Sequence, residues 1–94
     1  MAVAVLTIHL ELPDCTSLKD KRSRVKPILT RLHKEFNISA AEVDLQDHWR
    51  EAVIACAIIG NDRVFLNNAL QAVLEFINRM WPDLPIMAEH IEIW

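Results

Sequence analysis

The sequence contains a single glycine, Gly60, among its 94 residues. Loops that cradle phosphate groups need several closely spaced glycines, so a phosphate-binding loop of that type is excluded. The two cysteines, Cys15 and Cys56, are far apart, so no Cys-x-x-Cys metal motif is present. No nucleophile stands beside a base in a recognisable catalytic pattern. We therefore expect no catalytic residues, no metal site and no cofactor, and an enzyme is the less favoured class.

Aromatic residues and long apolar runs are also scarce. Only three Phe and three Trp occur, and the expected strands lack the paired aromatics on which an RNA-recognition-motif sheet stacks bases. No apolar run reaches the length of a membrane span. The segment 1–12 lacks a basic start and continues as an alternating strand, so we do not expect a signal peptide.

The composition favours one compact domain covering residues 1–94. Apolar residues make up 52% of the chain, enough for a single modest core. Two isolated cysteines are typical of free thiols in a reducing cytoplasm. We expect Cys56 to be buried, Cys15 to be at least partly accessible, and no bond between them.

The stretch 38–60, ISAAEVDLQDHWREAVIACAIIG, predicts two strands joined by a polar turn. Its second half, 52–59, is entirely apolar and suits a strand buried on both faces, although a buried helix segment remains open from this run alone. Its first half, 38–45, mixes apolar residues with Glu42 and Asp44 and suits an outer strand.

The other segments complete an α+β arrangement. Residues 2–12 alternate as a strand, with Ala4, Leu6, Ile8, Leu10 and Leu12 on the core face. Ser17 and Asp20 predict the start of a helix that ends at Asn37, with an apolar stripe of Leu18, Val25, Leu29, Leu32 and Phe36. Pro27 predicts a kink, or a tight first turn with the regular helix starting nearer Val25.

A second helix is expected after Asn61 or Asp62 and ends before Pro82. Its inner face would carry Leu66, Ala69, Leu70, Val73, Ile77 and Met80, widened by Phe65, Leu74 and Phe76. Residues 86–94 read as a last strand. The order strand, helix, strand, strand, helix, strand predicts a ferredoxin-like fold, with an antiparallel sheet in the order 4-1-3-2 and both helices on one face.

This topology has two consequences for function. The segments 13–17, 47–50 and 81–84 would meet at one end of the sheet, together with Lys19, Lys21, Arg22 and Trp81. The opposite sheet face would carry no helix and would show Val3, Val5, Thr7, His9, Glu42 and Asp44. Its apolar residues could be buried most simply against a second copy of the chain.

Charge is unevenly distributed. The net charge is −3, yet seven of the ten basic residues lie between Lys19 and Lys34. Such clustering can provide sequence-independent affinity for RNA or another polyanion, but for this segment alone a solvated helix face is the somewhat favoured interpretation. Our candidate nucleic-acid-binding residues are Lys19, Lys21, Arg22, Arg24, Lys26, Trp49 and Arg50.

Two further features keep alternatives open. Trp49 lies in a polar turn and is either packed over the sheet end or a contact anchor. The candidate open-face residues His9, Glu42 and Asp44, with His90 nearby, combine imidazole and carboxylate groups that can bind metal or move protons, but an ordinary polar sheet surface is the favoured interpretation. An enzyme that uses this face is the weakest option.

Several short segments together resemble the YlxP-like family of small bacterial proteins of unknown function. They are SLKDKR at 17–22, NISAAEVDLQDHW at 37–49 with its AEVD and QD-x-W elements, and ND at 61–62. The resemblance covers nearly the whole chain, although Pro27 and His48 depart from the family pattern. It implies a ferredoxin-like fold, a bacterial cytoplasmic setting and genes beside those for translation initiation and ribosome maturation. It supplies no catalytic residues.

The leading hypothesis is a non-catalytic protein that binds RNA or a ribosomal particle through the basic helix. The alternative is a homodimeric interaction or ligand-sensing module that uses the open sheet face. Salt-dependent RNA binding separates the two.

Overall fold

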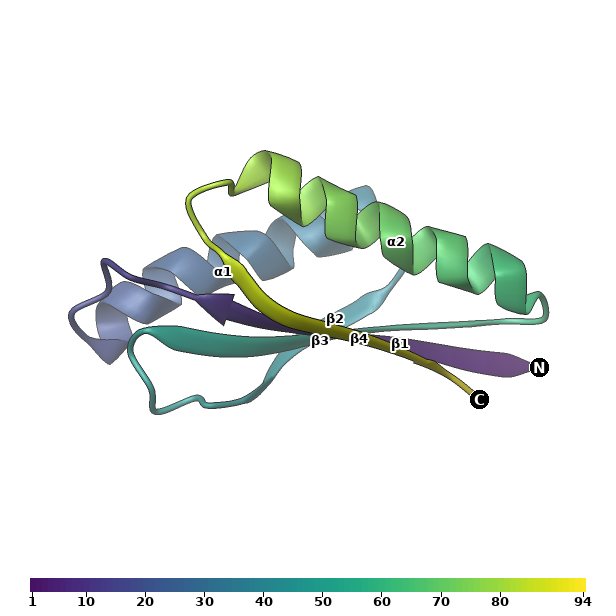
Figure 1. The fold of residues 1–94 in the computed structure, drawn as a ribbon, viewed down its shortest axis with the longest axis horizontal. Helices are drawn as coiled ribbons and strands as arrows, with labels where there is room; N and C mark the ends of the chain where they lie inside the picture. The colour runs from purple at the N-terminus through teal and green to yellow at the C-terminus, as the bar shows by residue number, and fades with distance from the viewer.

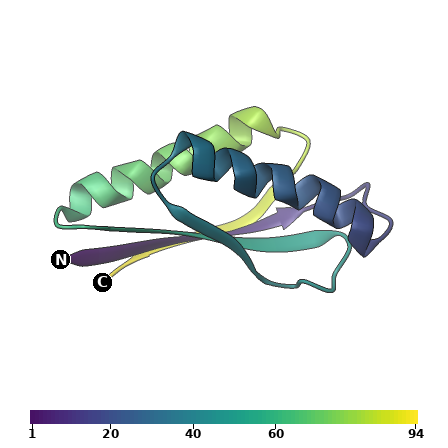
Figure 2. The same ribbon diagram turned by 180° about the vertical axis from the view of Figure 1, so that it is seen from behind.

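The computed structural model describes residues 1–94 as a four-stranded sheet covered on one face by two helices (Figure 1). The strands are antiparallel and lie in the order β2-β3-β1-β4, so the predicted ferredoxin-like topology is confirmed. The view from behind shows the same two layers (Figure 2). The elements are β1 (Ala2–Glu11), α1 (Leu18–Glu35), β2 (Ser39–Asp44), β3 (Glu51–Gly60), α2 (Arg63–Met80) and β4 (Ile86–Ile93).

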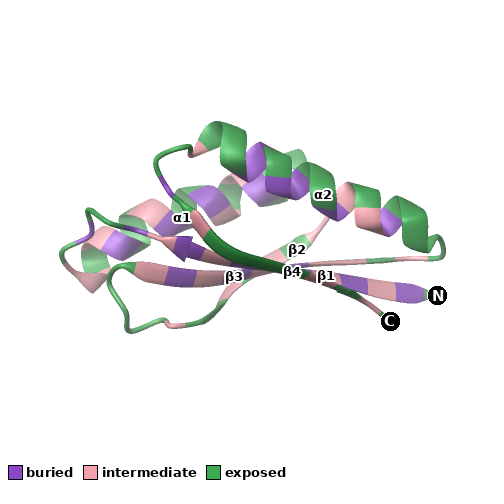
Figure 3. Cartoon of the chain, in the orientation of Figure 1, coloured by how far each residue is buried: buried purple, intermediate pink, exposed green.

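The core lies between the sheet and the helices. Every second residue of β1 is buried, as its alternation predicts, because successive side chains of a strand point to opposite faces. Buried and half-buried residues alternate along β1 and most of β3 (Figure 3). The buried ones form one core cluster with residues of both helices, so the buried side chains face the helices.

Strand β3 occupies the interior of the sheet, as its apolar sequence predicts. Only one of its faces is fully buried, however. Ala52, Ile54 and Cys56 face the helices and are inaccessible to solvent, whereas the opposite side is half-buried and Ile59 is 64% exposed. The expectation of burial on both faces is therefore wrong, because no element of this chain covers the second face.

Helix α1 begins where its capping signal predicts. The Ser17 hydroxyl accepts a hydrogen bond from the N–H of Asp20 (3.0 Å), and the Asp20 carboxylate accepts one from the N–H of Thr16 (3.1 Å). The helix then runs without a break through Pro27, so a regular helix starting nearer Val25 is wrong. Pro27 is exposed, and on that side water can bond the carbonyl that the ring leaves without a donor.

Asp62 caps α2 by accepting hydrogen bonds from the N–H groups of Val64 and Phe65 at 3.0 and 3.2 Å. Most of the predicted inner face between Leu66 and Ile77 is buried, with Ala69 half-buried, but two assigned members are exposed. Phe65 is 64% exposed and Met80 is 40% exposed; they lie in the first and last turns of the helix.

An irregularity in β2 changes which way its carboxylates face. Glu42 lies opposite Ile54, but Asp44 lies opposite Val53, so the register shifts at Val43. A residue inserted into one strand sends the side chains on either side of it to opposite faces. Glu42 therefore faces the helices with Ile54, and only Asp44 remains on the open face. The prediction that both lie on the open face is wrong for Glu42.

Both cysteines are buried free thiols. Cys56 is buried as predicted, but Cys15 is only 1% exposed, so its predicted accessibility is wrong. The Cys15 side chain belongs to the core cluster, although its loop neighbours Pro13, Asp14 and Thr16 are exposed. Burial is also the main factor that raises the pKa of the Cys15 thiol.

Neither helix is both long and apolar enough to cross a membrane.

Candidate functional site

Three loops meet at one end of the sheet, as the topology predicts. The N–H of Leu12 donates to the carbonyl of Arg50 at 2.8 Å, and the N–H of Glu11 donates to that of Pro85 at 2.9 Å. The β1–α1, β2–β3 and α2–β4 connections are thereby held close together (Figure 1). We call this the loop end.

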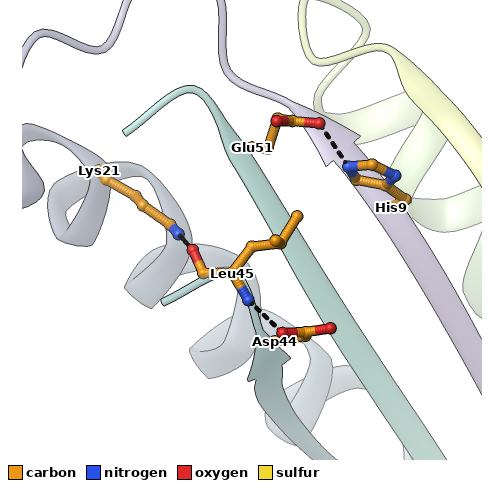
Figure 4. Close-up of polar contacts among 5 residues, drawn as sticks. All are labelled: His9, Lys21, Asp44, Leu45 and Glu51. Carbon is orange, nitrogen blue, oxygen red and sulfur yellow. Dashed lines mark hydrogen bonds and ion pairs between the residues drawn. The ribbon is translucent and has the colours of Figure 1, made fainter. Parts of the chain in front are cut away.

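Lys21 does not lie on the surface of the loop end. Its side chain is 2% exposed, and its ammonium donates a 2.6 Å hydrogen bond to the carbonyl oxygen of Leu45 (Figure 4). Nζ also lies 2.7 Å from Oε2 of Glu42, a buried oxygen that makes no well-directed hydrogen bond. This contact is therefore an ion pair. The ammonium already has two internal partners, so Lys21 is not available to an external phosphate.

Leu45 adopts the one positive φ in the chain, at 57°. A branched residue is disfavoured in this left-handed region, at a cost of roughly 1–2 kcal/mol. Its carbonyl accepts hydrogen bonds from Lys21 and from the N–H of His48 (3.0 Å), and its own N–H donates to the Asp44 carboxylate (2.8 Å). These bonds hold the start of the β2–β3 loop in one conformation.

The SLKDKR and AEVD segments thus contact each other in space. Ser17 caps the helix that carries Lys21, and Lys21 pairs with Glu42 of the AEVD segment. The sequence carries a signal for this burial, because Lys21 is spaced from Val25, Ile28 and Leu32 as members of one helix face. We assigned Lys21 to the basic surface because charged residues are rarely buried unless paired, and its partner lies on another element.

The remaining cations form a stripe on the outward face of α1. Helical spacing places Lys19, Arg22, Lys26 and Lys34 on one side, and all four are exposed. The two acidic residues of the helix lie elsewhere and have partners, since Asp20 accepts from Thr16 and Glu35 pairs with Arg31 at 3.1 Å. We name these four residues the α1 basic stripe. Arg24 is only half-exposed and lies on the flank of the helix.

A shallow hollow runs along this face of α1. Its volume is about 540 Å³, and its lining includes three basic residues. The residues that line it are Arg22, Ser23, Lys26, Pro27, Thr30 and Arg31.

Trp49 and Arg50 lie in the β2–β3 loop, next to the start of α1. Nε of Arg50 donates to the carbonyl of Cys15 at 3.3 Å, which ties this loop to the one that leads into α1. Trp49 is 51% exposed, so it does not fold back into the core. It borders a second open hollow of about 620 Å³ with Asp47, His48, Arg50 and Glu51, which we call the Trp49 hollow. The other tryptophan expected at this end, Trp81, packs edge-on against Phe76, with 6.0 Å between the ring centroids.

The open sheet face carries two separate histidine–carboxylate pairs. Nε2 of His9 lies 2.8 Å from the carboxylate of Glu51 (Figure 4), and Nε2 of His90 lies 3.0 Å from that of Glu92. Glu51 was not among our candidates, yet the pairing of β1 with β3 places it next to His9. Nowhere do three His, Cys, Asp or Glu side chains converge as metal ligands would.

Comparison with known proteins matches this chain to proteins without an assigned function. Residues 3–91 match the family described as "Protein of unknown function (DUF503)". The chain is also 42% identical over 65 residues to the "Uncharacterized protein YlxP" of Bacillus subtilis (strain 168). The aligned region covers 69% of this chain and 71% of that protein. The chain therefore belongs to the YlxP-like, or DUF503, family of proteins of unknown function.

Proposed function

We propose that this protein is a non-catalytic cytoplasmic protein that binds RNA, free or within a ribosomal particle, through the α1 basic stripe. The observation that carries the proposal is the exposed row Lys19, Arg22, Lys26 and Lys34, with the acidic residues of α1 engaged elsewhere. Cations in a row along a helix are the usual means of contacting a phosphate backbone.

The overall charge of −3 does not oppose this role. At physiological ionic strength, charges farther apart than about 8 Å are largely screened from one another. A polyanion on the outer face of α1 therefore responds mainly to the stripe, and less to the acidic residues of the sheet and α2. The acidic residues outside α1 would repel RNA from the other surfaces and so restrict the contact to this one face.

Salt-dependent binding provides the test. The double variant Arg22→Gln/Lys26→Gln removes two charges from the stripe, and Arg63→Gln/Arg79→Gln removes two from α2. The variants have equal net charge, so they separate a localised contact from general electrostatic attraction. We expect the stripe variant to weaken binding of a single-stranded RNA oligonucleotide and to reduce the slope of log K against log salt by about 1.4. The α2 variant should change the slope much less.

Two results would contradict the proposal. The first is no detectable binding of the intact protein at low salt. The second is an equal loss of affinity in the two double variants, which would show that no particular face is used.

A second candidate function, a homodimer, is favoured by the apolar residues of the open sheet face. Val53, Ala55, Ala57 and Ile59 of β3 lie directly opposite His9, Thr7, Val5 and Val3 of β1, and opposed residues share a face. The apolar members of this set form a continuous strip that no element of the chain covers. A two-fold contact would bury it with one self-complementary surface.

A further inference from the structure

Trp49 is the exposed aromatic residue of the loop end. It is 51% exposed, whereas Trp81 packs against Phe76. A tryptophan held half in solvent is a suitable stacking platform, because it offers a large planar face and loses little side-chain entropy on contact.

The backbone beneath Trp49 is held in place before any partner arrives. Lys21 fixes the carbonyl of Leu45 at one side of the loop, at 2.6 Å. At the other side, Arg50 accepts from the N–H of Leu12 at 2.8 Å and donates to the carbonyl of Cys15 at 3.3 Å. A partner that binds here need not order the loop, which reduces the entropic cost of binding.

The charges around Trp49 suit a base better than a phosphate. Asp47 and Glu51 line the Trp49 hollow together with His48 and Arg50. The two carboxylates offset the positive charge of Arg50, so the hollow offers a phosphate group little attraction, and Glu51 also pairs with His9 at 2.8 Å. Carboxylates can instead accept hydrogen bonds from N–H groups on the exposed edge of an unpaired base, such as the N3–H of uracil. The bond from Arg50 to Cys15 places the hollow beside the start of α1, where the basic stripe begins.

We propose that the Trp49 hollow takes an unpaired base of single-stranded RNA, stacked on the indole, while the adjoining phosphates follow the α1 basic stripe. This inference rests on the proposed function and adds a substrate class to it. In a duplex the bases are paired and stacked inside, so their faces are not available to Trp49. The protein therefore prefers a single strand to a duplex.

The test uses a fluorescein-labelled 12-nucleotide oligo(U), a duplex of the same length, and fluorescence anisotropy at low salt. We expect the single strand to bind more tightly than the duplex. Trp49→Ala should weaken single-strand binding roughly 5- to 150-fold, the range observed for loss of one stacked base. It should leave the salt slope unchanged, because no phosphate contact is lost. Trp94→Ala is the matched control, since Trp94 is 60% exposed and lies at the other end of the sheet.

The outcomes separate the two proposals. If oligo(U) and the duplex bind equally and Trp49→Ala binds as the intact protein does, the base site is refuted and the α1 stripe survives. If neither RNA binds, both proposals fail. A third outcome comes from a pull-down with the tagged protein. If Trp49→Ala no longer retains a protein that the intact chain retains, while its RNA affinity is unchanged, Trp49 contacts a protein partner and the base site is again refuted.

Discussion

The ammonium of Lys21 on α1 donates a 2.6 Å hydrogen bond to the carbonyl oxygen of Leu45, 24 residues farther along the chain. This hydrogen bond connects the inner face of the helix to the start of the β2–β3 loop. The same ammonium lies beside the carboxylate of Glu42. A single buried charge thus joins α1 to the stretch from Glu42 to Leu45, at the end of β2.

Replacing Lys21 with methionine tests how much this contact contributes to the free energy of unfolding. Lys21→Met preserves the apolar stem but leaves the Glu42 carboxylate and the Leu45 carbonyl without their donor. Removing one partner of a buried ion pair costs about 3–5 kcal/mol, so we expect a loss of that order in the free energy of unfolding measured in urea. Lys19→Met, on the exposed face, should change it by less than about 0.5 kcal/mol.

A second substitution shows whether the cost comes from the unpaired charge. Lys21→Met/Glu42→Leu removes both ionic partners, and we expect it to recover much of the lost stability, because a buried ion pair can often be replaced by apolar residues. If Lys21→Met were as well tolerated as Lys19→Met, the burial of this pair would be contradicted.

The left-handed conformation of Leu45 leads to a prediction about the loop. Asn tolerates positive φ better than Leu does, and a β-branched residue tolerates it least. We therefore expect Leu45→Val to be less stable than Leu45→Asn by about 1–2 kcal/mol in urea unfolding, even though Val is the more apolar of the two. The reverse order would show that burial of the side chain outweighs the backbone conformation here.

The alkaline stability of the protein should depend on Cys56. Burial raises the pKa of this thiol from its ordinary value of 9.0 to about 11. Above pH 9 the unfolded chain loses this proton before the folded chain does, so the stabilisation is complete below pH 9 and is lost as the pH rises through 11. Between pH 8 and 11 we expect the wild type to lose roughly 2–3 kcal/mol more than Cys56→Ala, as measured by urea unfolding at each pH. Parallel pH curves for the two proteins would contradict the raised pKa.

The helices and strands that depend on short-range sequence patterns were predicted correctly. Alternation in 2–12, the apolar run 52–59 and the capping residue Ser17 each depend on a few neighbouring residues, and together they specified the sheet order.

The features that were missed depend on pairing between distant segments. The register shift at Val43 turns Glu42 toward Lys21, and nothing in the local alternation of 38–45 indicates it. Positive φ at Leu45 is equally hidden, because leucine is not a residue that marks this conformation. Cys15 was misplaced because a loop position was taken to mean exposure.

The open sheet face supports a prediction about oligomeric state. Ala55 lies in the middle of this face, opposite Thr7 on β1 and Ala41 on β2. If two copies pack through the apolar strip, Ala55→Lys would bury a like charge from each copy close to the two-fold axis, and the pair should dissociate. We expect light scattering at micromolar concentration to give twice the chain mass of 10.8 kDa for the intact protein and the chain mass for Ala55→Lys. Ala72→Lys on the exposed side of α2 adds the same charge far from the strip and should leave the dimer intact. A mass of 10.8 kDa for the intact protein, unchanged on concentrating, would exclude the homodimer.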